Sequence, residues 1–262
     1  MAEVDIDGIE SLAFEVFKIM KKQKEKSNII KNSIPILYFG NLDLYENSNK
    51  KIITVGLNPS NKEFLDNDKK YSVNFRFPCS KLSILDHKDF LVYKKDLDNY
   101  FDYNPYSQWF NSLCPILSGF QAGFGGTLKK CQSYENTAIH TDIATPFATD
   151  PTFSGLEDNE KCYLLNEGFE IWKKLILYLK PDIIILSGNK RIKEKLMESF
   201  CLSGSNFEKI QNLECLEVWT AAIKIDPSKD ALLIYGQTAN FPFGKISNEN
   251  KKKIGSEILK KI

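Results

Sequence analysis

The stretch IITVGLNPS, residues 52–60, decides the fold class of this chain. Its β-branched run ends at Gly56, and Asn58-Pro59-Ser60 begins two residues later. A continuous apolar run of about five residues is typical of a strand covered on both faces of a parallel sheet. Asparagine and proline after such a run favour a turn. The stretch therefore predicts a buried strand that carries polar residues to its end, where open α/β sheets bind ligands.

Three further apolar runs have the same character, and each ends at glycine or leads into proline. They are TAIHTDIA from Thr137, DIIILSG from Asp182 and ALLIYG from Ala231. Segments with helical periodicity separate the runs, such as YLLNEGFEIWKKLILYLK before Pro181, and LEVWTAAIKI from Leu216 predicts one more strand. Strands that alternate with helices indicate an α/β protein. We predict a three-layer α/β/α sandwich with a central, mainly parallel sheet of four to five strands.

The whole chain, residues 1–262, is predicted to form a single domain. Apolar residues at spacings of three and four predict an N-terminal amphipathic helix over about residues 9–26. The closing segment KKKIGSEILKKI predicts a short basic helix. A polar, aromatic-rich stretch over about residues 61–106 is too long for a simple connection, so we expect an insertion that faces the substrate.

The composition argues against several classes of protein. The formal net charge of +1, from 35 basic and 34 acidic residues, means that nucleic acid would have to bind through a local basic face. The six cysteines form no C-x-x-C pair, which argues against a zinc site and favours reduced thiols. The start MAEVDIDGIE lacks the features of a signal peptide, and no segment has the roughly 18 uninterrupted apolar residues that span a bilayer. We expect a cytoplasmic protein that uses no metal or cofactor and contacts no membrane.

Polar residues follow each of the four main predicted strands. Asn58 follows the first, Asp142 lies at the end of the second, Asn189 follows the third, and GQTANFPFG from Gly236 follows the fourth. The carboxyl ends of parallel strands meet at one edge of a sheet, so these residues are predicted to line one crevice. For each of these residues taken alone, a structural role in a turn or as a helix cap is the alternative to a functional role.

These motifs resemble those of the uracil-DNA glycosylase superfamily, especially its mismatch-specific and thymine-DNA glycosylase branch. GLNPS, residues 56–60, is similar to that branch's Gly-Ile-Asn-Pro-Gly motif. TDIATPF resembles the family's Thr-Asn-x-x-x-Pro strand end, KPDIIILSG its third strand, and ALLIYGQTANFPFG stands in the place of its His-Pro-Ser-Pro loop. The resemblance spans about residues 52–243 and implies hydrolysis of the N-glycosidic bond of a flipped base, which leaves an abasic site.

The resemblance assigns roles to the residues of the first motif. Asn58 would position and polarise the attacking water. Gly56, Leu57 and Pro59 would shape the base pocket through backbone groups. Hydrolysis of the bond develops positive charge on the sugar and negative charge on the departing base, so the enzyme needs a held water and donors toward the base. A neutral asparagine holds water without being a strong base, which implies slow turnover.

Two residues depart from the family's uracil readers in a consistent direction. Ser60 stands where tight uracil enzymes of the family place a tyrosine that blocks C5 of the pyrimidine, so a C5 substituent would fit. Asp142 replaces the asparagine that contacts the uracil edge. A carboxylate only accepts hydrogen bonds, so it would repel O4 of uracil and bind the N4 amino group of cytosine. If protonated, the same carboxyl would assist the departure of the base; a helix-capping role for Asp142 is the alternative.

The family's histidine is missing from the loop after the fourth predicted strand. Neutral donors that would support the departing base take its place, namely Gln237, Thr238 and Asn240. The chain's two histidines, His87 and His140, lie on no family motif, and His140 is predicted to be packed. The missing histidine argues against efficient excision of plain uracil.

Aromatic residues supply candidates for contacts with the DNA bases. The resemblance implies an aromatic side chain that stacks on the extruded base, for which the candidates are Phe75 and Phe77, with Tyr71 as the runner-up. Phe241 or Phe243 would act as the wedge that fills the vacated stack. For all of these residues, packing in the core or in a buried loop is the alternative.

The predicted function is a monofunctional DNA glycosylase whose favoured substrate is a C5-substituted cytosine, such as the glucosylated hydroxymethylcytosine of phage DNA. The biological role would be host defence or base repair. The alternatives are a repair glycosylase for uracil or T·G mismatches, a catalytically silent DNA- or nucleotide-binding module, and a nucleoside hydrolase or transferase. The expected partner is DNA, either double-stranded with a flipped base or single-stranded, and the protein is expected to be a monomer. The candidate phosphate contacts are Lys69, Lys70, Lys129, Lys130, Lys190 and Arg191.

Overall fold

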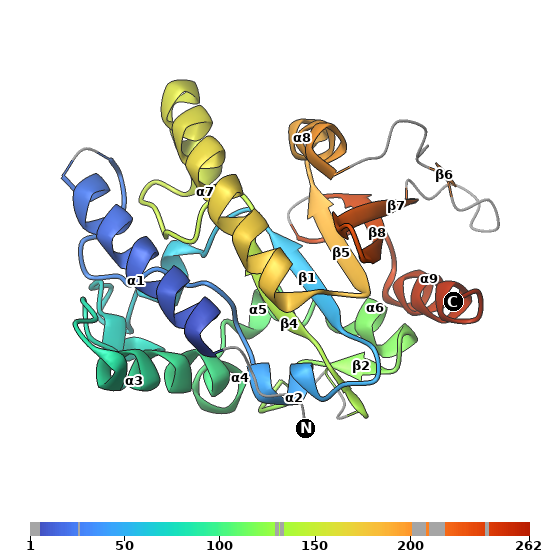
Figure 1. The fold of residues 1–262 in the computed structure, drawn as a ribbon, viewed down its shortest axis with the longest axis horizontal. Coiled ribbons are helices and arrows are strands. Elements are labelled where there is room, and N and C mark those ends of the chain that lie inside the picture. The colour runs from blue at the N-terminus through green and yellow to red at the C-terminus, as the bar shows by residue number, and fades with distance from the viewer. Residues whose placement is uncertain are drawn as a thin grey trace. The chain divides into compact units, whose positions relative to one another are not determined.

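The predicted α/β class is confirmed by a mainly parallel central sheet with helices around it (Figure 1). The computed structural model describes residues 6–25, 27–128, 131, 134–200, 208–209, 218–238 and 241–262. The sheet has six strands in the order β4-β1-β5-β8-β7-β6, so it exceeds the predicted four to five. In that order the strands are Ile139–Asp142, Ile52–Gly56, Ile183–Gly188, Lys229–Gln237, Val218–Asp226 and Glu208–Lys209.

The burial of the strands explains why the sequence located them. β1 and β5 are buried at every residue, as continuous apolar runs in a parallel sheet are. β5 pairs in parallel with both β1 and β8. β7 runs antiparallel to β8 and is partly exposed, and the two-residue β6 pairs with β7. The four main predicted runs and the additional run from Leu216 therefore all contain strands.

The chain divides into two compact units, which are described separately. The first unit comprises Met1–Asn41, Leu57–Tyr106 and Thr141–Leu179. The second comprises Leu42–Gly56, Ser107–His140 and Lys180–Ile262. The chain leaves the second unit at the end of β1, so the residues that follow Gly56 begin a new segment of the first unit.

In the first unit, α1 (Ile6–Gln23) packs against α7 (Asp158–Leu179) and α3 (His87–Asp98), and Figure 1 shows α1 alongside α7. The Gln23 amide donates to Glu167 of α7. Lys174 of α7 forms an ion pair with Glu15 of α1 at 2.7 Å. The predicted N-terminal helix is therefore present, with bounds that differ by a few residues from the expected 9–26.

The predicted insertion, residues 61–106, forms part of the core of the first unit. It contains η1 (Asn61–Glu63), η2 (Val73–Phe75), α3 and α4 (Tyr100–Tyr103), and η3 (Phe153–Gly155) follows later in the same unit. Phe64, Phe77 and Tyr100 are all buried, and the rings of Phe77 and Tyr100 stack with centroids 5.7 Å apart. The aromatic residues that suggested a substrate-facing loop thus partly serve packing.

In the second unit, α6 (Cys114–Gly119) packs against α9 (Asn248–Leu259), where a basic C-terminal helix was predicted. The two helices approach so closely that a Cβ on Gly119 would lie 2.2 Å from the carbonyl oxygen of Lys252. The unit also contains α2 (Leu42–Glu46), α5 (Ser107–Phe110), α8 (Lys190–Phe200), and a small parallel sheet of β2 (Ala122–Gly123) and β3 (Asn136–Thr137).

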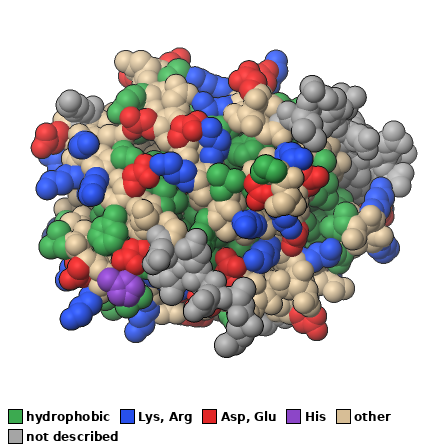
Figure 2. Space-filling model, in the orientation of Figure 1, with side chains coloured by type: hydrophobic (Ala, Val, Ile, Leu, Met, Phe, Trp, Pro, Cys, Tyr) green, Lys and Arg blue, Asp and Glu red, His purple; other side chains and the backbone are tan. Residues whose placement is uncertain are grey.

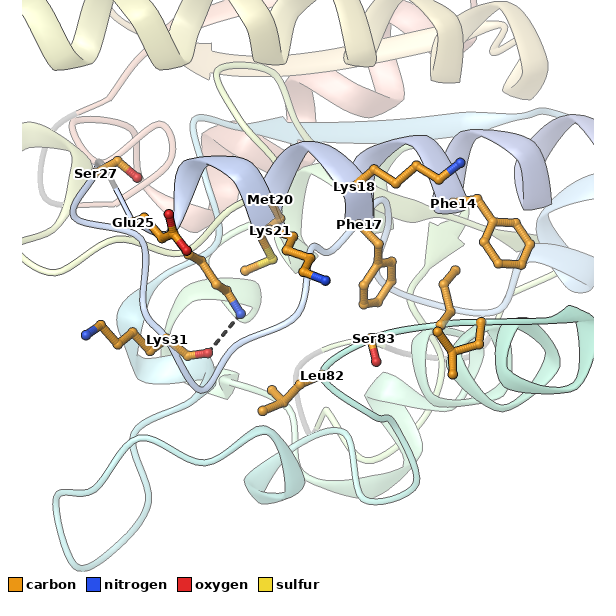
Figure 3. Close-up of a pocket in the computed structure, with 13 residues that line it drawn as sticks. Phe14, Phe17, Lys18, Met20, Lys21, Glu25, Ser27, Lys31, Leu82 and Ser83 are labelled. Carbon is orange, nitrogen blue, oxygen red and sulfur yellow. Dashed lines mark hydrogen bonds between the residues drawn. The ribbon is translucent and has the colours of Figure 1, made fainter.

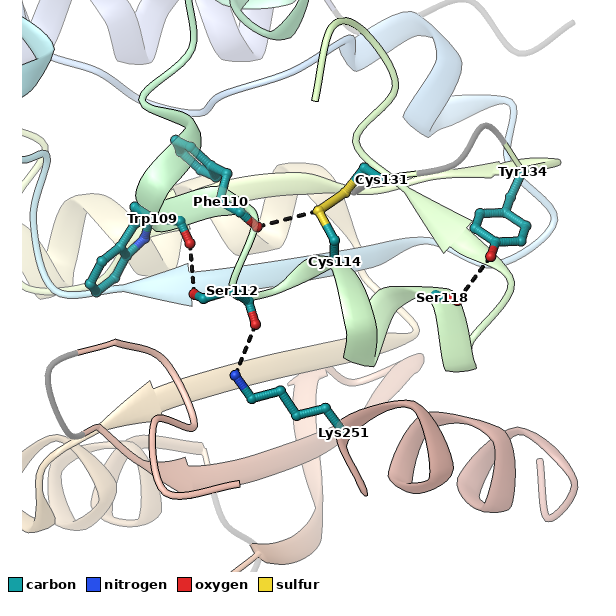
Figure 4. Close-up of a disulfide and its surroundings, with 8 residues drawn as sticks. All are labelled: Trp109, Phe110, Ser112, Cys114, Ser118, Cys131, Tyr134 and Lys251. Atoms are coloured by element: carbon teal, nitrogen blue, oxygen red, sulfur yellow. Dashed lines mark hydrogen bonds between the residues drawn. A yellow bond between two sulfur atoms is a disulfide. The ribbon is translucent and has the colours of Figure 1, made fainter. Parts of the chain in front are cut away.

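A disulfide corrects the expectation of reduced thiols. Cys114 and Cys131 are bonded, with their Cα atoms 5.0 Å apart (Figure 4). Cys79 and Cys162 are free cysteines within the described part of the chain. The two cysteines are 17 positions apart in the sequence, and no local motif marks the pair, because the fold of α6 and the following segment brings the two residues together. Disulfides are typical of oxidising compartments, so the cytoplasmic location stays a prediction.

The surface is mixed in charge. On the face that Figure 2 shows, basic and acidic side chains of the described residues are interspersed, in keeping with a net charge of +1. Within the described ranges, no helix has both the length and the apolar character needed to cross a bilayer.

Candidate functional site

Asn58 is held in one orientation just after β1. Its Nδ2 group donates to the carbonyl oxygens of Pro59 at 3.0 Å and Phe147 at 3.3 Å. Both N–H bonds of the amide are thereby used, so the remaining polar atom of the side chain, Oδ1, is an acceptor. An acceptor in a fixed position suits the binding of a water molecule through one of its protons.

The turn that carries Asn58 is tied to the loop that follows β4. The carbonyl oxygen of Leu57 accepts from the backbone N–H groups of Ala144 at 2.8 Å and Thr145 at 3.3 Å. Asp142 is the last residue of β4 and is only 6% exposed. Because α7 begins only at Asp158, Asp142 caps no helix there. The structure thus brings Asn58 and Asp142, predicted from two separate motifs, onto adjoining segments of the first unit.

The loop after β4 is fixed by close packing as well as by hydrogen bonds. A Cβ on Gly168 of α7 would lie 2.0 Å from the carbonyl oxygen of Ala144, so only glycine allows this contact. Ile36 donates its N–H to Pro146 at 2.8 Å, and Trp172 donates from its indole to Thr141 at 3.0 Å. The segment that holds Asn58 is therefore itself supported from two sides.

Glu63 is a candidate residue that the sequence analysis missed. Ser60 is the N-cap of η1, and its Oγ accepts from the N–H of Lys62 at 3.2 Å. Glu63, at the end of η1, is 2% exposed. The Tyr100 hydroxyl donates to Glu63 Oε2 at 2.6 Å, and Arg76 Nε lies 3.4 Å from the same oxygen. A buried carboxyl therefore lies three residues beyond the predicted motif.

The environment of Glu63 makes its carboxyl titrate near neutral pH. Burial raises its pKa from 4.5 to about 7. The charge of Arg76 and the hydrogen bond from Tyr100 oppose this rise, whereas the negative charge of Asp142 adds to it. The pattern Ser60-x-x-Glu63 was the available signal, but it matches a capping box, in which glutamate bonds back to the helix start.

The two predicted stacking residues lie in different environments. Phe77 is fully buried, between Phe64 and Tyr100. Phe75 is half-buried, and the guanidinium of Arg76 lies 4.9 Å from the centre of its ring. Phe75 therefore offers ring surface that Phe77 does not. Tyr71, the runner-up, donates from its hydroxyl to Asp150 at 2.6 Å.

The predicted residues at the end of β8 belong to the second unit. Gln237 and Thr238 are exposed, and Thr238 Oγ1 lies 2.9 Å from Ser187 Oγ. Asn240 lies outside the described residues. These side chains are accessible to a ligand, and Gly56, the last residue of β1, is buried in the same unit.

The two wedge candidates also differ. Phe243 is fully buried and its backbone N–H donates to Ser187 Oγ at 3.1 Å. Its ring fills the space beside Gly236, where an added Cβ would lie 2.2 Å away. Phe241 is half-buried. Of the two predicted wedges, Phe241 is partly exposed, whereas Phe243 serves packing.

Lys251 anchors the segment between these phenylalanines. Its Nζ donates to the carbonyl oxygens of Pro242 and Ser112, both at 3.0 Å, and Figure 4 shows the contact with Ser112. Burial lowers the pKa of Lys251 to about 8. Because both of these hydrogen bonds go to backbone carbonyl oxygens, we assign Lys251 a structural role rather than a role in the candidate site.

The histidines and basic residues add little to the candidate site. His140 is 2% exposed, and its Nδ1 lies 2.7 Å from Thr54 Oγ1, as expected for a packed residue. Lys129 and Lys130 lie outside the described residues. The other predicted phosphate contacts are exposed in the turn after η1 and at the start of α8, namely Lys69, Lys70, Lys190 and Arg191. Among the residues described, no group of three or more potential ligands is arranged to hold a metal ion.

A separate cavity of about 960 Å³ lies along α1 (Figure 3). Phe14, Phe17 and Met20 of α1 face Leu82 across it, and lysines line its rim. None of the predicted site residues lines this cavity. It is therefore distinct from the segments that carry Asn58, Asp142 and Glu63.

Comparison of the sequence with protein-family models and with curated proteins finds no match. The functional interpretation therefore depends on the residues of this chain and their geometry. Within the first unit, a hydrogen bond joins the fixed amide of Asn58 to the segment that carries the buried Asp142, and a second buried carboxyl group, Glu63, lies on the segment of Asn58 itself.

Proposed function

We propose that the protein is a monofunctional DNA glycosylase that hydrolyses the N-glycosidic bond of a flipped-out, modified pyrimidine. The favoured substrate is a C5-substituted cytosine, such as the glucosylated hydroxymethylcytosine of phage DNA, and the product is an abasic site. One observation carries the proposal: the Asn58 amide is fixed by two backbone carbonyls, with its oxygen as the acceptor, on a turn bonded to the loop after Asp142.

Asn58 holds the attacking water in this mechanism. The C1′–N1 bond breaks as positive charge develops on the sugar, and the water adds to C1′ from the position that Oδ1 of Asn58 defines. The enzyme supplies position and electrostatic stabilisation, which are usually the largest contributions to such a reaction. The nucleotide must be flipped out of the duplex, because a base that stays in the stack cannot reach Asn58 or the other protein side chains.

Asp142 selects the base because a carboxylate accepts hydrogen bonds and donates none. As a carboxylate it accepts a hydrogen bond from the N4 amino group of cytosine, and it repels O4 of uracil or thymine. Its position at the buried end of β4 supports this role. Ser60 leaves room for a group on C5, because its side chain is short and its Oγ turns toward the Lys62 N–H.

The partner is DNA, double-stranded with a flipped base or single-stranded. Phe75, which is half-buried in the first unit, stacks on the extruded base, and for Phe241, which is half-buried in the second unit, the role of wedge stays a prediction from the sequence. For Gln237 and Thr238, which belong to the second unit, the role of neutral donors to the leaving base stays a prediction from the sequence. Host defence against phage with modified DNA and repair of damaged pyrimidines are both consistent with this chemistry.

The experiment that tests the proposal measures base release from a panel of duplex and single-stranded oligonucleotides. Each carries one uracil, T·G mismatch, hydroxymethylcytosine or glucosylated hydroxymethylcytosine, and alkali converts any abasic site into a strand break. We expect the strongest cleavage with a modified cytosine. Cleavage of uracil or T·G substrates alone would favour the repair alternative, and no cleavage of any substrate would contradict the enzyme proposal and favour a silent binding module.

The assignment of Asp142 has its own test in the same assay. Asp142→Asn turns a pure acceptor into a side chain that also donates, so we expect the ratio of uracil to modified-cytosine excision to rise about 10-fold or more. An unchanged ratio would show that Asp142 does not contact the base edge.

A further inference from the structure

The cavity along α1, which we call the α1 cavity, has no role in the proposed mechanism. It lies within the first unit, where residues 14–21 of α1 form one side and residues 82–85 form another, and its volume is about 960 Å³ (Figure 3). Pockets for small organic ligands have volumes of about 300–1,000 Å³ and are lined mostly by apolar side chains. The α1 cavity is therefore large enough for such a ligand.

The apolar side chains of the α1 cavity are incompletely covered. Phe14 and Phe17 extend from α1 toward the segment that carries Leu82 (Figure 3), and Phe14 is only half-buried. Leu82 is 47% exposed, and Leu85, at 82%, is the most exposed large apolar side chain of the described residues. Removing apolar surface from water is favourable. An aliphatic group laid along these side chains would therefore be stabilised.

The charged residues of the α1 cavity are mostly cationic. Those among the described lining residues are Lys18, Lys21, Lys24, Lys31 and Glu25. Lys24 is half-buried, and its Nζ donates to the carbonyl oxygens of Lys31 and Ser33, both at 2.8 Å. These two bonds fix the ammonium group and use two of its three N–H donors. The cavity thus combines an apolar surface with a cation that is already held in place.

We propose that the α1 cavity binds a long-chain carboxylate, with the carboxylate on Lys24 and the aliphatic chain along Phe14 and Leu82. Lys24 follows Phe14 by ten residues, about 15 Å along a helix axis, so a long chain is needed to reach from one to the other. A small polar anion would leave the leucines exposed, and a cationic amphiphile would be repelled by the lysines. This site does not rest on the proposed function, because none of the predicted site residues lines the cavity.

Calorimetric titration of the full chain with sodium dodecanoate tests the proposal. We expect saturable binding of one dodecanoate per chain. Acetate has the carboxylate without the chain, and dodecyltrimethylammonium has the chain with the opposite charge, so each should bind at least about 10-fold more weakly. Equal binding of dodecyltrimethylammonium would reveal a nonspecific surfactant effect and overturn the proposal. So would a lack of dodecanoate binding, and attachment to phosphatidylglycerol vesicles in that case would identify a membrane-binding face instead.

Lys24→Met locates the carboxylate. The substitution keeps the length of the side chain and removes its charge, so the affinity for dodecanoate should fall by about 10-fold or more. Lys22→Met is the matched control, because Lys22 is an exposed lysine of α1 that does not line the cavity. That control should bind dodecanoate within about twofold of wild type. Equal affinities of the two variants would place the ligand elsewhere and overturn the assignment.

Leu82→Asp separates ligand binding from folding, since Lys24 also fixes the backbone at Lys31 and Ser33. Leu82 is largely exposed, so its replacement should leave the thermal midpoint of unfolding close to that of wild type. The new negative charge in the cavity should weaken dodecanoate binding by about 10-fold or more. Unchanged affinity in Leu82→Asp would contradict the proposal. If the protein released no base from any DNA, the proposed function would fail, whereas these titrations would still decide the occupant of the α1 cavity.

Discussion

Two strands of this protein, β1 and β8, have a glycine near their end that polar residues follow, but these polar side chains are held differently. After β1, the polar Asn58 is held by carbonyl oxygens of its own turn and of the loop after β4. After β8, Gln237 and Thr238 are exposed, while Phe243 turns inward and fills the space beside Gly236. The polar side chain at the β1 end is held by two backbone carbonyl oxygens, whereas at the β8 end Thr238 contacts Ser187 Oγ at 2.9 Å and stays exposed. The loop after β8 also serves packing, through the buried ring of Phe243.

Phe243→Ala tests the packing role of the β8 end and has the largest expected effect on stability. Removing a fully buried phenylalanine ring should lower the free energy of unfolding by about 3–5 kcal/mol. Phe241→Ala, at a half-buried position, should cost less than about 1 kcal/mol. Urea unfolding of both variants gives the comparison, and equal losses would contradict the distinction between the two residues.

Asn58→Ala tests the functional role of the β1 end. Loss of the group that holds the water should slow single-turnover excision by about 100- to 1,000-fold, with DNA binding retained. The matched control is Asn74→Ala, because Asn74 also donates to a backbone carbonyl, that of Pro78 at 3.0 Å, on the surface of the same unit. That control should stay within about twofold of the wild-type rate. Undiminished turnover in Asn58→Ala would refute its assignment.

Gly168→Ala tests the support behind Asn58. The added methyl group would meet the carbonyl oxygen of Ala144, and backbone yields less readily than a side chain. We expect a loss of about 1–3 kcal/mol in unfolding free energy and slower excision, because Ala144 and Thr145 hold Leu57. Gly155→Ala would meet only the Pro151 side chain, at 3.2 Å, and should cost less. A Gly168→Ala protein with wild-type stability and rate would show that the loop tolerates displacement.

Glu63 predicts a smaller, pH-dependent effect on stability. Its folded pKa of about 7 lies above the ordinary 4.5, so the folded protein binds the proton more tightly than the unfolded chain does. The stabilisation is complete below about pH 4.5 and is lost as the pH rises through 7, with a slope of at most about 1.4 kcal/mol per pH unit. Unfolding free energies measured from pH 4.5 to 8 should fall for wild type and stay flatter for Glu63→Gln. Parallel curves would contradict the raised pKa.

Much of the fold could be predicted because burial leaves a pattern in the sequence. The strands β1 and β5 are apolar throughout since both of their faces are covered, and α1 repeats its apolar residues at helical spacing. The disulfide could not be predicted, because its two cysteines are joined only by the fold. The burial of Phe243 could not be predicted, because its ring packs where Gly236 has no side chain.

The candidate site could be predicted only in part, because some of its residues depend on partners that are distant in the sequence. Asn58 and Asp142 stand at strand ends, which the sequence marks. Glu63 was missed because its partner Tyr100 is 37 residues away, so the local pattern indicated a helix cap instead. Residues whose role depends on distant partners leave little trace in a single sequence.

The central claim is that the Asn58 site excises a modified cytosine from DNA. The most direct measurement incubates the protein, and its Asn58→Ala variant, with duplex DNA that contains glucosylated hydroxymethylcytosine, and identifies any released base by mass spectrometry. We predict that the wild type releases the intact modified base and leaves abasic sites, and that the variant releases it at least about 100-fold more slowly. No released base from the wild type, or equal release by both proteins, would contradict the claim.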